Sequence, residues 1–429
     1  MPGTSFAVEE TTIDGIHAAM LAGELRCSAL VEAYLQRIDA FDRDGPKLNT
    51  IVSLCDQARR RAAELDEELA ATGRWSGPLH GIPVLVKDCI DPRFGRVERR
   101  IGRGCRGEPR HRRAGHRLRR LGPVPASFCN VVGIRTTPEV VSHEGTLVLV
   151  ARQDTIGPLA RSVADAAALL SVMADQGTSA RSAAAQFSSD EPADMQAIAQ
   201  ARIGVLRSAF GDGHPEMTAV NAVVNRALET AAAAGATLVD VAIPGLRADL
   251  EATSMYLLRS RHDVDTWLAG RPGLSARTVR EIQAERLYDP RLDLIDAIAA
   301  SPDFSAANPE IGRRQAAREA FTAKLEEAMN ARQLDLLAYP TVQVFSPLRD
   351  EPAEWTTLTF PTNTVIASQA WMPAMSLPAG LGAGGPVGLE LLARQHDEAR
   401  LLRLGAAIER VTRQRRPPAS TPAGAGRGR

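Results

Sequence analysis

A dense run of arginine divides this 429-residue chain. Twelve arginines lie between Arg93 and Arg120, against two acidic residues, Glu98 and Glu108. The apolar residues among them are too few to give the period of a helix or a strand. Because unpaired charges are not buried in a protein core, this segment cannot supply central strands to a fold. Any core must therefore be built from the residues on either side of it.

The rest of the composition is that of a globular protein. Hydrophobic residues make up 44% of the chain, which is enough for a sizeable core. The formal net charge is zero, so the chain as a whole gives no electrostatic reason to expect nucleic acid or a membrane, and no apolar run is long enough to span a bilayer. The five cysteines are never spaced as CxxC, which argues against a zinc site and a disulfide framework. This cysteine usage suits a reducing cytoplasm, and we expect a cytoplasmic protein.

Hydrophobic patterning predicts an α/β fold with a mixed sheet. Residues 200–240 show the succession strand, helix, strand that is typical of a βαβ unit. Buried strands are expected over 334–339 and twice within 375–392, where the glycine turn GLGAGG separates them. A helix is expected over 397–411.

Two further helices have predicted N-caps, Ser28 and Ser162. The helix after Ser28 has an apolar face that begins at Leu30 and runs to Phe41. A short apolar strand is expected at 84–86, directly before a lysine.

Familiar cofactor motifs are absent or misplaced. Gly102, Gly104 and Gly107 spell GxGxxG, but no strand precedes them, as a dinucleotide fingerprint requires. The histidines lack metal-ligand spacing, and no GxSxG, Walker or HExxH motif occurs. We therefore predict neither a cofactor nor a metal. His80 is expected to have a structural role in its turn.

Lys87 is the candidate catalytic residue. It is one of only three lysines, and it ends an apolar run where a solvated charge does not belong. Burial lowers the pKa of a lysine and can turn it into a general base. The alternative is a surface lysine paired with Asp88, and the spacing alone does not decide between them.

The motif GPLHGIPVLVKD around Lys87 resembles the lysine motif of the amidase signature family. These amide hydrolases include fatty acid amide hydrolase and the A subunit of glutamyl-tRNA amidotransferase. PASFCNVVGIRTTPEVVS and QDTIGPLARSVADAAALL resemble the segments that follow the family's catalytic serine. LLAYPTVQVFSP and the strands and helix after Met375 resemble its C-terminal part, whereas residues 180–330 match weakly.

The resemblance implies a mixed-sheet core flanked by helices, here with its central part missing, and a Ser–cisSer–Lys triad. In that triad a neutral lysine takes a proton from the serine held by a cis peptide, and this serine activates the nucleophilic serine. The reaction converts a small-molecule amide and water to a carboxylate and ammonia or an amine, without a cofactor. Only Lys87 can be carried over to this chain as a catalytic residue.

Both triad serines are missing from the expected places. Only 37 residues separate Lys87 from Pro125, too few for the family's glycine- and serine-rich loop. The nucleophile should occupy position 121, which is Leu121, and no serine lies between Ser76 and Ser127. We therefore expect an inactive or impaired amidase-like protein.

Three explanations compete for the arginine-rich segment at 93–120. A frameshift followed by a deletion is favoured, because the composition changes sharply on one side and family motifs return on the other. A disordered insert is the second, and a loop that binds nucleic acid or another anion is the third, although Phe94 is its lone aromatic residue. If activity remained, four residues would be candidate surrogate nucleophiles: Cys89, Cys105, Ser127 and Cys129.

We expect a single amidase-like domain over 1–415. It would comprise an N-terminal part with the lysine strand at 1–90, the aberrant segment at 92–121 and the remainder at 122–415, followed by a disordered tail at 416–429. A homodimer is compatible with this interpretation.

Overall fold

The structure is a computed structural model. It describes residues 6–87, 89–90, 122–187, 191–271, 273, 277–290, 292–348 and 354–419, without the side chains of 191–193. Asp88, the arginine-rich segment, Cys105, Leu121 and residues 420–429 lie outside the described residues.

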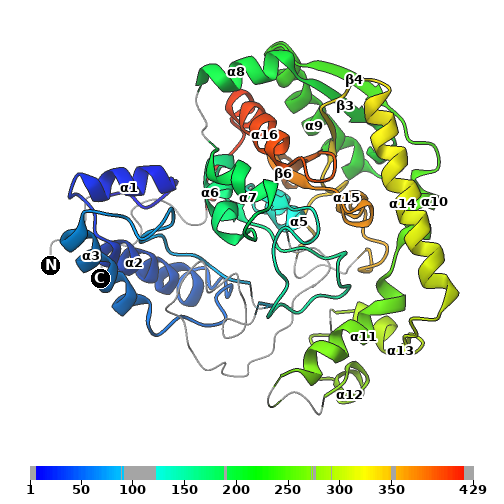
Figure 1. Cartoon of the computed structure of the whole chain (residues 1–429), viewed down its shortest axis with the longest axis horizontal. Helices are drawn as coiled ribbons and strands as arrows, with labels where there is room; N and C mark the ends of the chain where they lie inside the picture. The colour runs from blue at the N-terminus through cyan, green and yellow to red at the C-terminus, as the bar shows by residue number, and fades with distance from the viewer. Residues whose placement is uncertain are drawn as a thin grey trace. The chain divides into compact units, whose positions relative to one another are not determined.

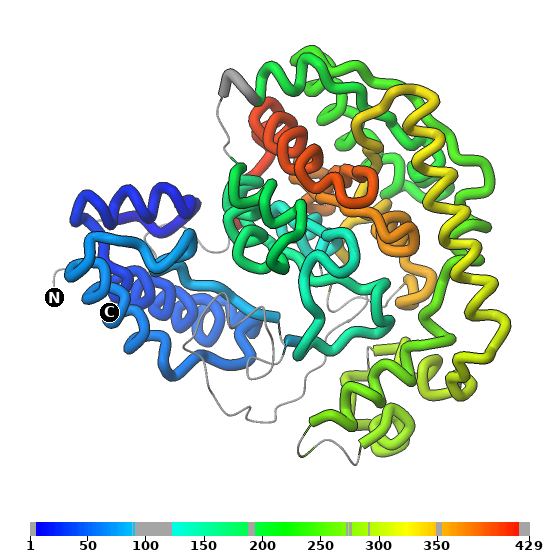
Figure 2. Tube along the Cα trace, viewed as in Figure 1, coloured from blue at the N-terminus to red at the C-terminus, as the bar shows by residue number. Residues whose placement is uncertain are grey.

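The chain divides into two compact units (Figures 1 and 2). The N-terminal unit comprises 1–112, 144–146 and 416–429, and the sheet unit comprises 113–143 and 147–415. Each unit is described by itself below. The single domain over 1–415 stays a prediction.

Helices build the N-terminal unit. They are α1 (Ile13–Leu21), α2 (Cys27–Arg37), the π-helix η1 (Ile38–Arg43) and α3 (Ala58–Thr72). The apolar faces of α1, α2 and α3 meet in one core that includes Met20, Leu30 and Ala62. The predicted apolar face is confirmed at both ends, since Leu30 and Phe41 are buried.

The start of α2 differs from the prediction. The helix begins at Cys27, and its N-cap residue is Arg26, which makes no side-chain cap. Asp66 of α3 caps the helix instead, because its carboxylate accepts hydrogen bonds from the N–H groups of Cys27 (2.6 Å) and Ser28 (3.1 Å). The Ser28 hydroxyl also donates to Asp66, at 2.6 Å. A carboxylate at a helix N-terminus satisfies free N–H groups and favours the helix dipole, whichever element carries it.

A mixed sheet forms the centre of the sheet unit. Within the described residues it has seven strands in the order β2-β1-β6-β7-β5-β3-β4. The strands are β1 (Val132–Arg135), β2 (Leu159–Ala160), β3 (Arg202–Leu206), β4 (Thr237–Val241), β5 (Leu336–Pro340), β6 (Ala374–Gly382) and β7 (Gly385–Leu392). Strand β3 pairs in parallel with β4 and β5, and the other pairs are antiparallel. The α/β fold with a mixed sheet is confirmed.

Helices and a 3₁₀ turn precede, connect and follow these strands in the described part of the unit. They are α5 (Pro123–Phe128), α6 (Val163–Met173), α7 (Ser179–Ala185), α8 (Glu191–Gln200), η2 (Arg207–Ala209), α9 (Pro215–Ala233), α10 (Leu246–Thr253), α11 (Tyr256–Ala269), α12 (Val279–Ala284), α13 (Leu294–Ala300), α14 (Pro309–Asn330), α15 (Thr364–Ala370) and α16 (Glu398–Thr412). The βαβ unit predicted over 200–240 is confirmed as β3, α9 and β4. Ser162 caps α6, as predicted, by accepting a hydrogen bond from the N–H of Asp165.

Each face of the central strands packs against helices (Figure 1). Met375 of β6 points toward α16, where a Cβ atom on Gly405 would lie 2.6 Å from its sulfur. On the opposite face, Tyr339 of β5 and Leu392 of β7 share one apolar cluster with residues of α14 and α15. This arrangement explains why these strands are apolar on both faces.

Two sequence expectations concern the cysteines and the membrane. Cys27, Cys89 and Cys129 carry free thiols, and Cys55 is disulfide-bonded, so the described cysteines include one in a disulfide but do not form a disulfide framework. No helix in the described part of the chain is long and apolar enough to cross a bilayer.

Candidate functional site

Lys87 ends an irregular segment of the N-terminal unit. Residues 82–87 form neither helix nor strand, and Leu85 and Val86 are 76% and 38% exposed. Lys87 itself is half-buried. The prediction of a short apolar strand at 84–86 is therefore wrong. A strand needs a neighbour to take its backbone hydrogen bonds, and the pairing described nearby is one isolated bridge between Ile90 and Thr146.

The turn before this segment holds two imidazoles against an indole. The ring of Trp75 stacks on His17 with ring centroids 4.7 Å apart, and it tilts against His80 at 5.0 Å. His17 Nε2 lies 2.9 Å from the carbonyl oxygen of His80, and Ser76 Oγ lies 3.0 Å from His80 Nδ1. His80 is buried. These contacts hold the His80 ring in the turn, as the sequence predicts.

Ser127 lies near the end of α5 and is buried. A Cβ atom on Gly388 would lie 2.6 Å from the Oγ atoms of both Ser127 and Ser376, and Ser376 Oγ is 2.8 Å from Thr341 Oγ1. The hydroxyl of Ser127 therefore packs against the backbone of β7, where even a methyl group does not fit. This packing argues against Ser127 as a nucleophile for an external substrate.

The cysteine residues are also weak candidates for a surrogate nucleophile. Cys89 is buried, and Cys105 lies outside the described residues. Cys129 is exposed at its surface, but the surrounding protein desolvates its sulfur and raises the pKa of its thiol, an effect that Arg415 opposes. Because the thiolate is the nucleophile, a raised pKa lowers reactivity at neutral pH.

A buried ionisable side chain lies on one face of the sheet. The sequence did not predict it as a candidate site residue. Glu390 of β7 lies opposite Tyr339 of β5 and Ser376 of β6. It is fully buried, and burial raises the pKa of its carboxyl group to about 8, although Tyr339 and Arg135 oppose this shift. Its Oε2 atom is buried without a hydrogen-bond partner in the described structure. The sequence feature that could have indicated Glu390 is a single acidic residue within the apolar run PVGLELLA.

Arg135 and Asp154 belong to the same buried group. Arg135 donates from Nη2 to the carbonyl oxygen of Gln153 at 2.7 Å, and burial lowers the pKa of its guanidinium. Asp154 accepts hydrogen bonds from the N–H groups of Leu149 (2.8 Å) and Val150 (3.1 Å). Burial raises the pKa of Asp154, and these N–H groups and Arg135 oppose that shift. These contacts fix the loop that follows β1, which is a structural role.

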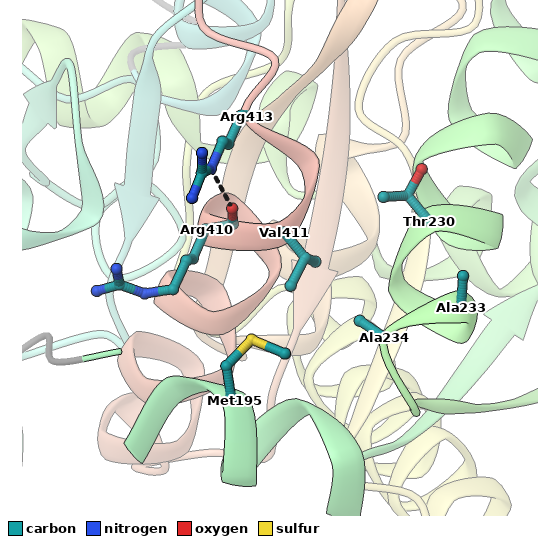
Figure 3. A pocket seen from close by; sticks show the side chains of 7 residues that line it. All are labelled: Met195, Thr230, Ala233, Ala234, Arg410, Val411 and Arg413. Atoms are coloured by element: carbon teal, nitrogen blue, oxygen red, sulfur yellow. Dashed lines mark hydrogen bonds between the residues drawn. The ribbon is translucent and has the colours of Figure 1, made fainter. Parts of the chain in front are cut away.

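A hollow of about 430 Å³ lies between α8, α9 and the end of α16 (Figure 3). Met195, Val411 and two alanines of the α9 end make its wall apolar, and Arg410 and Arg413 add cationic groups. Arg410 donates to the buried Asp194 at 2.8 Å. The lining holds no histidine, lysine or carboxylate that could serve as a base, so we assign no chemistry to it. No group of three or more potential metal ligands occurs in the described residues.

Comparison with known proteins gives a consistent picture. The chain matches the sequence model of the family described as Amidase over residues 29–93 and 123–402. The glutamyl-tRNA(Gln) amidotransferase of Chloroflexus aurantiacus has an A subunit that is 27% identical over 489 residues, covering 94% of this chain and 96% of that protein. The corresponding protein of Myxococcus xanthus is 32% identical over 309 residues, covering 67% of this chain and 60% of that protein.

Solved structures agree with the sequence comparison. The peptide amidase from Stenotrophomonas maltophilia has a TM-score of 0.76 at 27% identity, covering 96% of this chain and 98% of that one. A peptide amidase in complex with the competitive inhibitor chymostatin has a TM-score of 0.78 at 27% identity, covering 96% and 99%.

Proposed function

Because the chain belongs to the amidase family, we propose that it is an amide C–N hydrolase by descent whose catalytic site is incomplete. In this proposal, Lys87 is the remaining member of the Ser–cisSer–Lys triad, and hydrolysis of carboxylic amides is lost or strongly impaired. The ancestral substrate site would have bound small-molecule amides.

One observation carries the proposal. The family match stops at residue 93 and resumes at 123, and these limits enclose the arginine-rich segment. The alignment with the Chloroflexus protein extends over 489 residues, more than the 429 of this chain, so it requires gaps opposite this chain. The alignment length supports a loss of family sequence in this chain, and the interrupted family match supports its location where the two serines are expected.

The surroundings of Lys87 agree with an incomplete site. A lysine acts as a general base when it is buried and neutral beside the serine that it deprotonates. Here Lys87 is half-buried and follows exposed apolar residues, Leu85 and Val86. Removing the nucleophile of a serine hydrolase costs about 10⁶-fold in kcat. We therefore expect amide turnover near the uncatalysed level.

The test is ammonia release by the purified full-length chain. Substrates are primary amides of aliphatic and aromatic acids, together with C-terminally amidated peptides, because peptide amidases share this fold. The Lys87→Ala variant is compared with Lys47→Ala, which changes an exposed lysine of the same unit. No turnover above buffer in any of the three proteins is expected. Turnover that Lys87→Ala abolishes and Lys47→Ala retains would refute the proposal.

The second candidate is a non-catalytic protein that binds nucleic acid or another anion through residues 93–120. The density of arginine in this segment favours it. Salt-dependent binding to RNA or DNA that is lost on deletion of 93–120 would support this function, and no binding at low salt would exclude it.

Sequencing the gene around codons 88–125 and translating it in all frames separates a frameshift from an insert. A homodimer stays a prediction.

A further inference from the structure

The turn before the lysine motif brings the hydroxyl of an exposed serine to an imidazole nitrogen. Ser76 Oγ lies 3.0 Å from His80 Nδ1, and the backbone N–H of Ser76 donates to the same nitrogen at 3.2 Å. A backbone N–H can only donate, so Nδ1 is an acceptor and the ring hydrogen is on Nε2. We propose that Ser76 and His80 form a nucleophile–base pair that accepts acyl groups from aryl esters.

The pair has the access that the chemistry requires. Ser76 is exposed, whereas His80 is 2% exposed. The ring of Trp75 lies against the His80 imidazole, and His17 Nε2 contacts the His80 carbonyl oxygen. The base is therefore held in place beside a serine residue that is exposed to solvent. Held geometry of this kind is what lets a base assist an attacking hydroxyl.

A buried atom without a partner gives a second observation. His80 Nε2 is buried and has no hydrogen-bond partner in the described structure. Leaving a buried N–H unpaired is unfavourable, and such atoms in native proteins call for an explanation. With the ring hydrogen on Nε2, Nδ1 is the nitrogen that can exchange a proton with the Ser76 hydroxyl.

Charges around His80 suit a base that is protonated only briefly. Burial lowers the pKa of His80, so the ring is neutral at neutral pH. The carboxylates of Glu68 and Asp66 act in the opposite direction and stabilise an imidazolium, while His17 and Arg61 disfavour it. A general base needs both properties, since it must start neutral and accept a proton in the transition state.

The proposed reaction uses no other reagent than ester and water. Ser76 Oγ attacks the ester carbonyl carbon as its proton moves to His80 Nδ1. The bond to the phenolic oxygen then breaks, the phenolate leaves, and the imidazolium gives its proton to solvent. Water attacks the acyl-serine as it passes a proton to His80 Nδ1, and this proton moves to Ser76 Oγ as the carboxylic acid leaves. Amides are not expected to react, because an amide carbonyl is less electrophilic than that of an aryl ester and an amine is a poorer leaving group than a phenolate.

This inference is independent of the proposed loss of amide hydrolysis. It uses neither Lys87 nor the missing serines. Amide turnover would contradict the earlier proposal without affecting this one, and an unreactive Ser76 would contradict only this one.

The experiment measures where the full-length chain is acylated. The protein is treated with p-nitrophenyl acetate and, separately, with a fluorophosphonate probe, and labelled peptides are quantified by mass spectrometry. Ser53 is the internal reference, because it is an exposed serine of the same unit. We expect Ser76 to react about a hundredfold faster than Ser53, the acceleration typical of a positioned general base. Ser76→Ala should remove the fast label, and Ser53→Ala should retain it.

The pH profile tests the base without disturbing the core. The labelling rate at Ser76 should rise with pH at values below the ordinary titration range of histidine and then become level, because burial lowers the pKa at which His80 loses its proton. In Glu68→Gln the rise should occur at lower pH, because one carboxylate that favours the imidazolium is gone. Equal rates at Ser76 and Ser53, or a rate that climbs with hydroxide concentration up to pH 9, would overturn the proposal.

Discussion

The phenol of Tyr339 on β5 donates a hydrogen bond of 3.2 Å to the carboxyl group of Glu390 on β7, at the centre of the sheet. Both side chains are fully buried. Burial raises the pKa of Glu390 to about 8 and raises the pKa of Tyr339 well above its ordinary value. At neutral pH the pair is therefore uncharged, which is the cheaper form inside a protein.

This pair predicts a stability that falls as pH rises. The folded pKa of Glu390 lies above its unfolded value of 4.5, so its contribution is complete below about pH 4.5 and is lost as pH rises toward 8. By pH 7 the loss amounts to about 3 kcal/mol. Glu390→Gln removes the ionisation, so its free energy of unfolding should decline less between pH 5 and 8 in urea titrations. Glu229→Gln, at an exposed position, serves as the control, and equal slopes in the two variants would contradict the prediction.

Substitution by alanine should change the free energy of unfolding in opposite directions at Gly388 and Gly312. A Cβ atom on Gly388 would meet two hydroxyl oxygens at 2.6 Å, so Gly388→Ala should lower the free energy of unfolding by about 1–3 kcal/mol. Gly312 is exposed within α14 and has nothing within 4 Å of the added carbon, so Gly312→Ala should raise it by about 1 kcal/mol. Chemical denaturation of both variants checks the signs. A neutral Gly388→Ala would show that the strands relax around the methyl group.

Loss of the Asp66 carboxylate should loosen α2. Asp66→Ala leaves the N–H groups of Cys27 and Ser28 without their acceptor, at a cost of about 1–2 kcal/mol. Hydrogen exchange followed by mass spectrometry should show faster exchange in peptides from 27–37. Glu67→Ala changes an exposed neighbour on α3 and should leave those peptides unaffected. Unchanged protection in Asp66→Ala would mean that water replaces the cap.

The thiols of Cys27, Cys89 and Cys129 should differ in reactivity. Cys129 is exposed, whereas Cys27 and Cys89 are buried, and burial, together with Asp66, raises the pKa of Cys27 to about 12. Iodoacetamide should therefore modify Cys129 in the folded protein and the two buried residues only after unfolding. Peptide mapping with and without urea measures this order. Early modification of Cys27 would indicate that the N-terminal unit opens readily.

Regular patterns predicted the regular part of the fold. The period-two and period-3.6 signals of 200–240, 375–392 and 397–411 correspond to β3–α9–β4, the β6–β7 hairpin and α16. In these stretches the local preference and the buried surface agree, so the pattern alone is sufficient.

Features that depend on distant partners could not be predicted in this way. The run at 84–86 has the composition of a strand, but a strand exists only where a neighbour accepts its hydrogen bonds. The cap of α2 comes from Asp66, 38 residues beyond Ser28, and no local motif announces it. Glu390 becomes significant only when pairing places it beside Tyr339. For the candidate site, the sequence supplied Lys87 and the absence of serines, while the contact between Ser76 and His80 required coordinates.

The position of the β6–β7 hairpin sets the order in which a growing chain can assemble. Strand β1 ends at Arg135, yet its neighbour β6 begins at Ala374, and the same hairpin separates β1 from β5. At a translation rate of about 5–20 residues per second, β1 leaves the ribosome roughly 10–50 s before β6, its partner on the side away from β2. During that interval its edge is open to other chains. Expression of this protein should therefore be sensitive to chaperones that hold nascent chains, and truncation before residue 374 should give insoluble product.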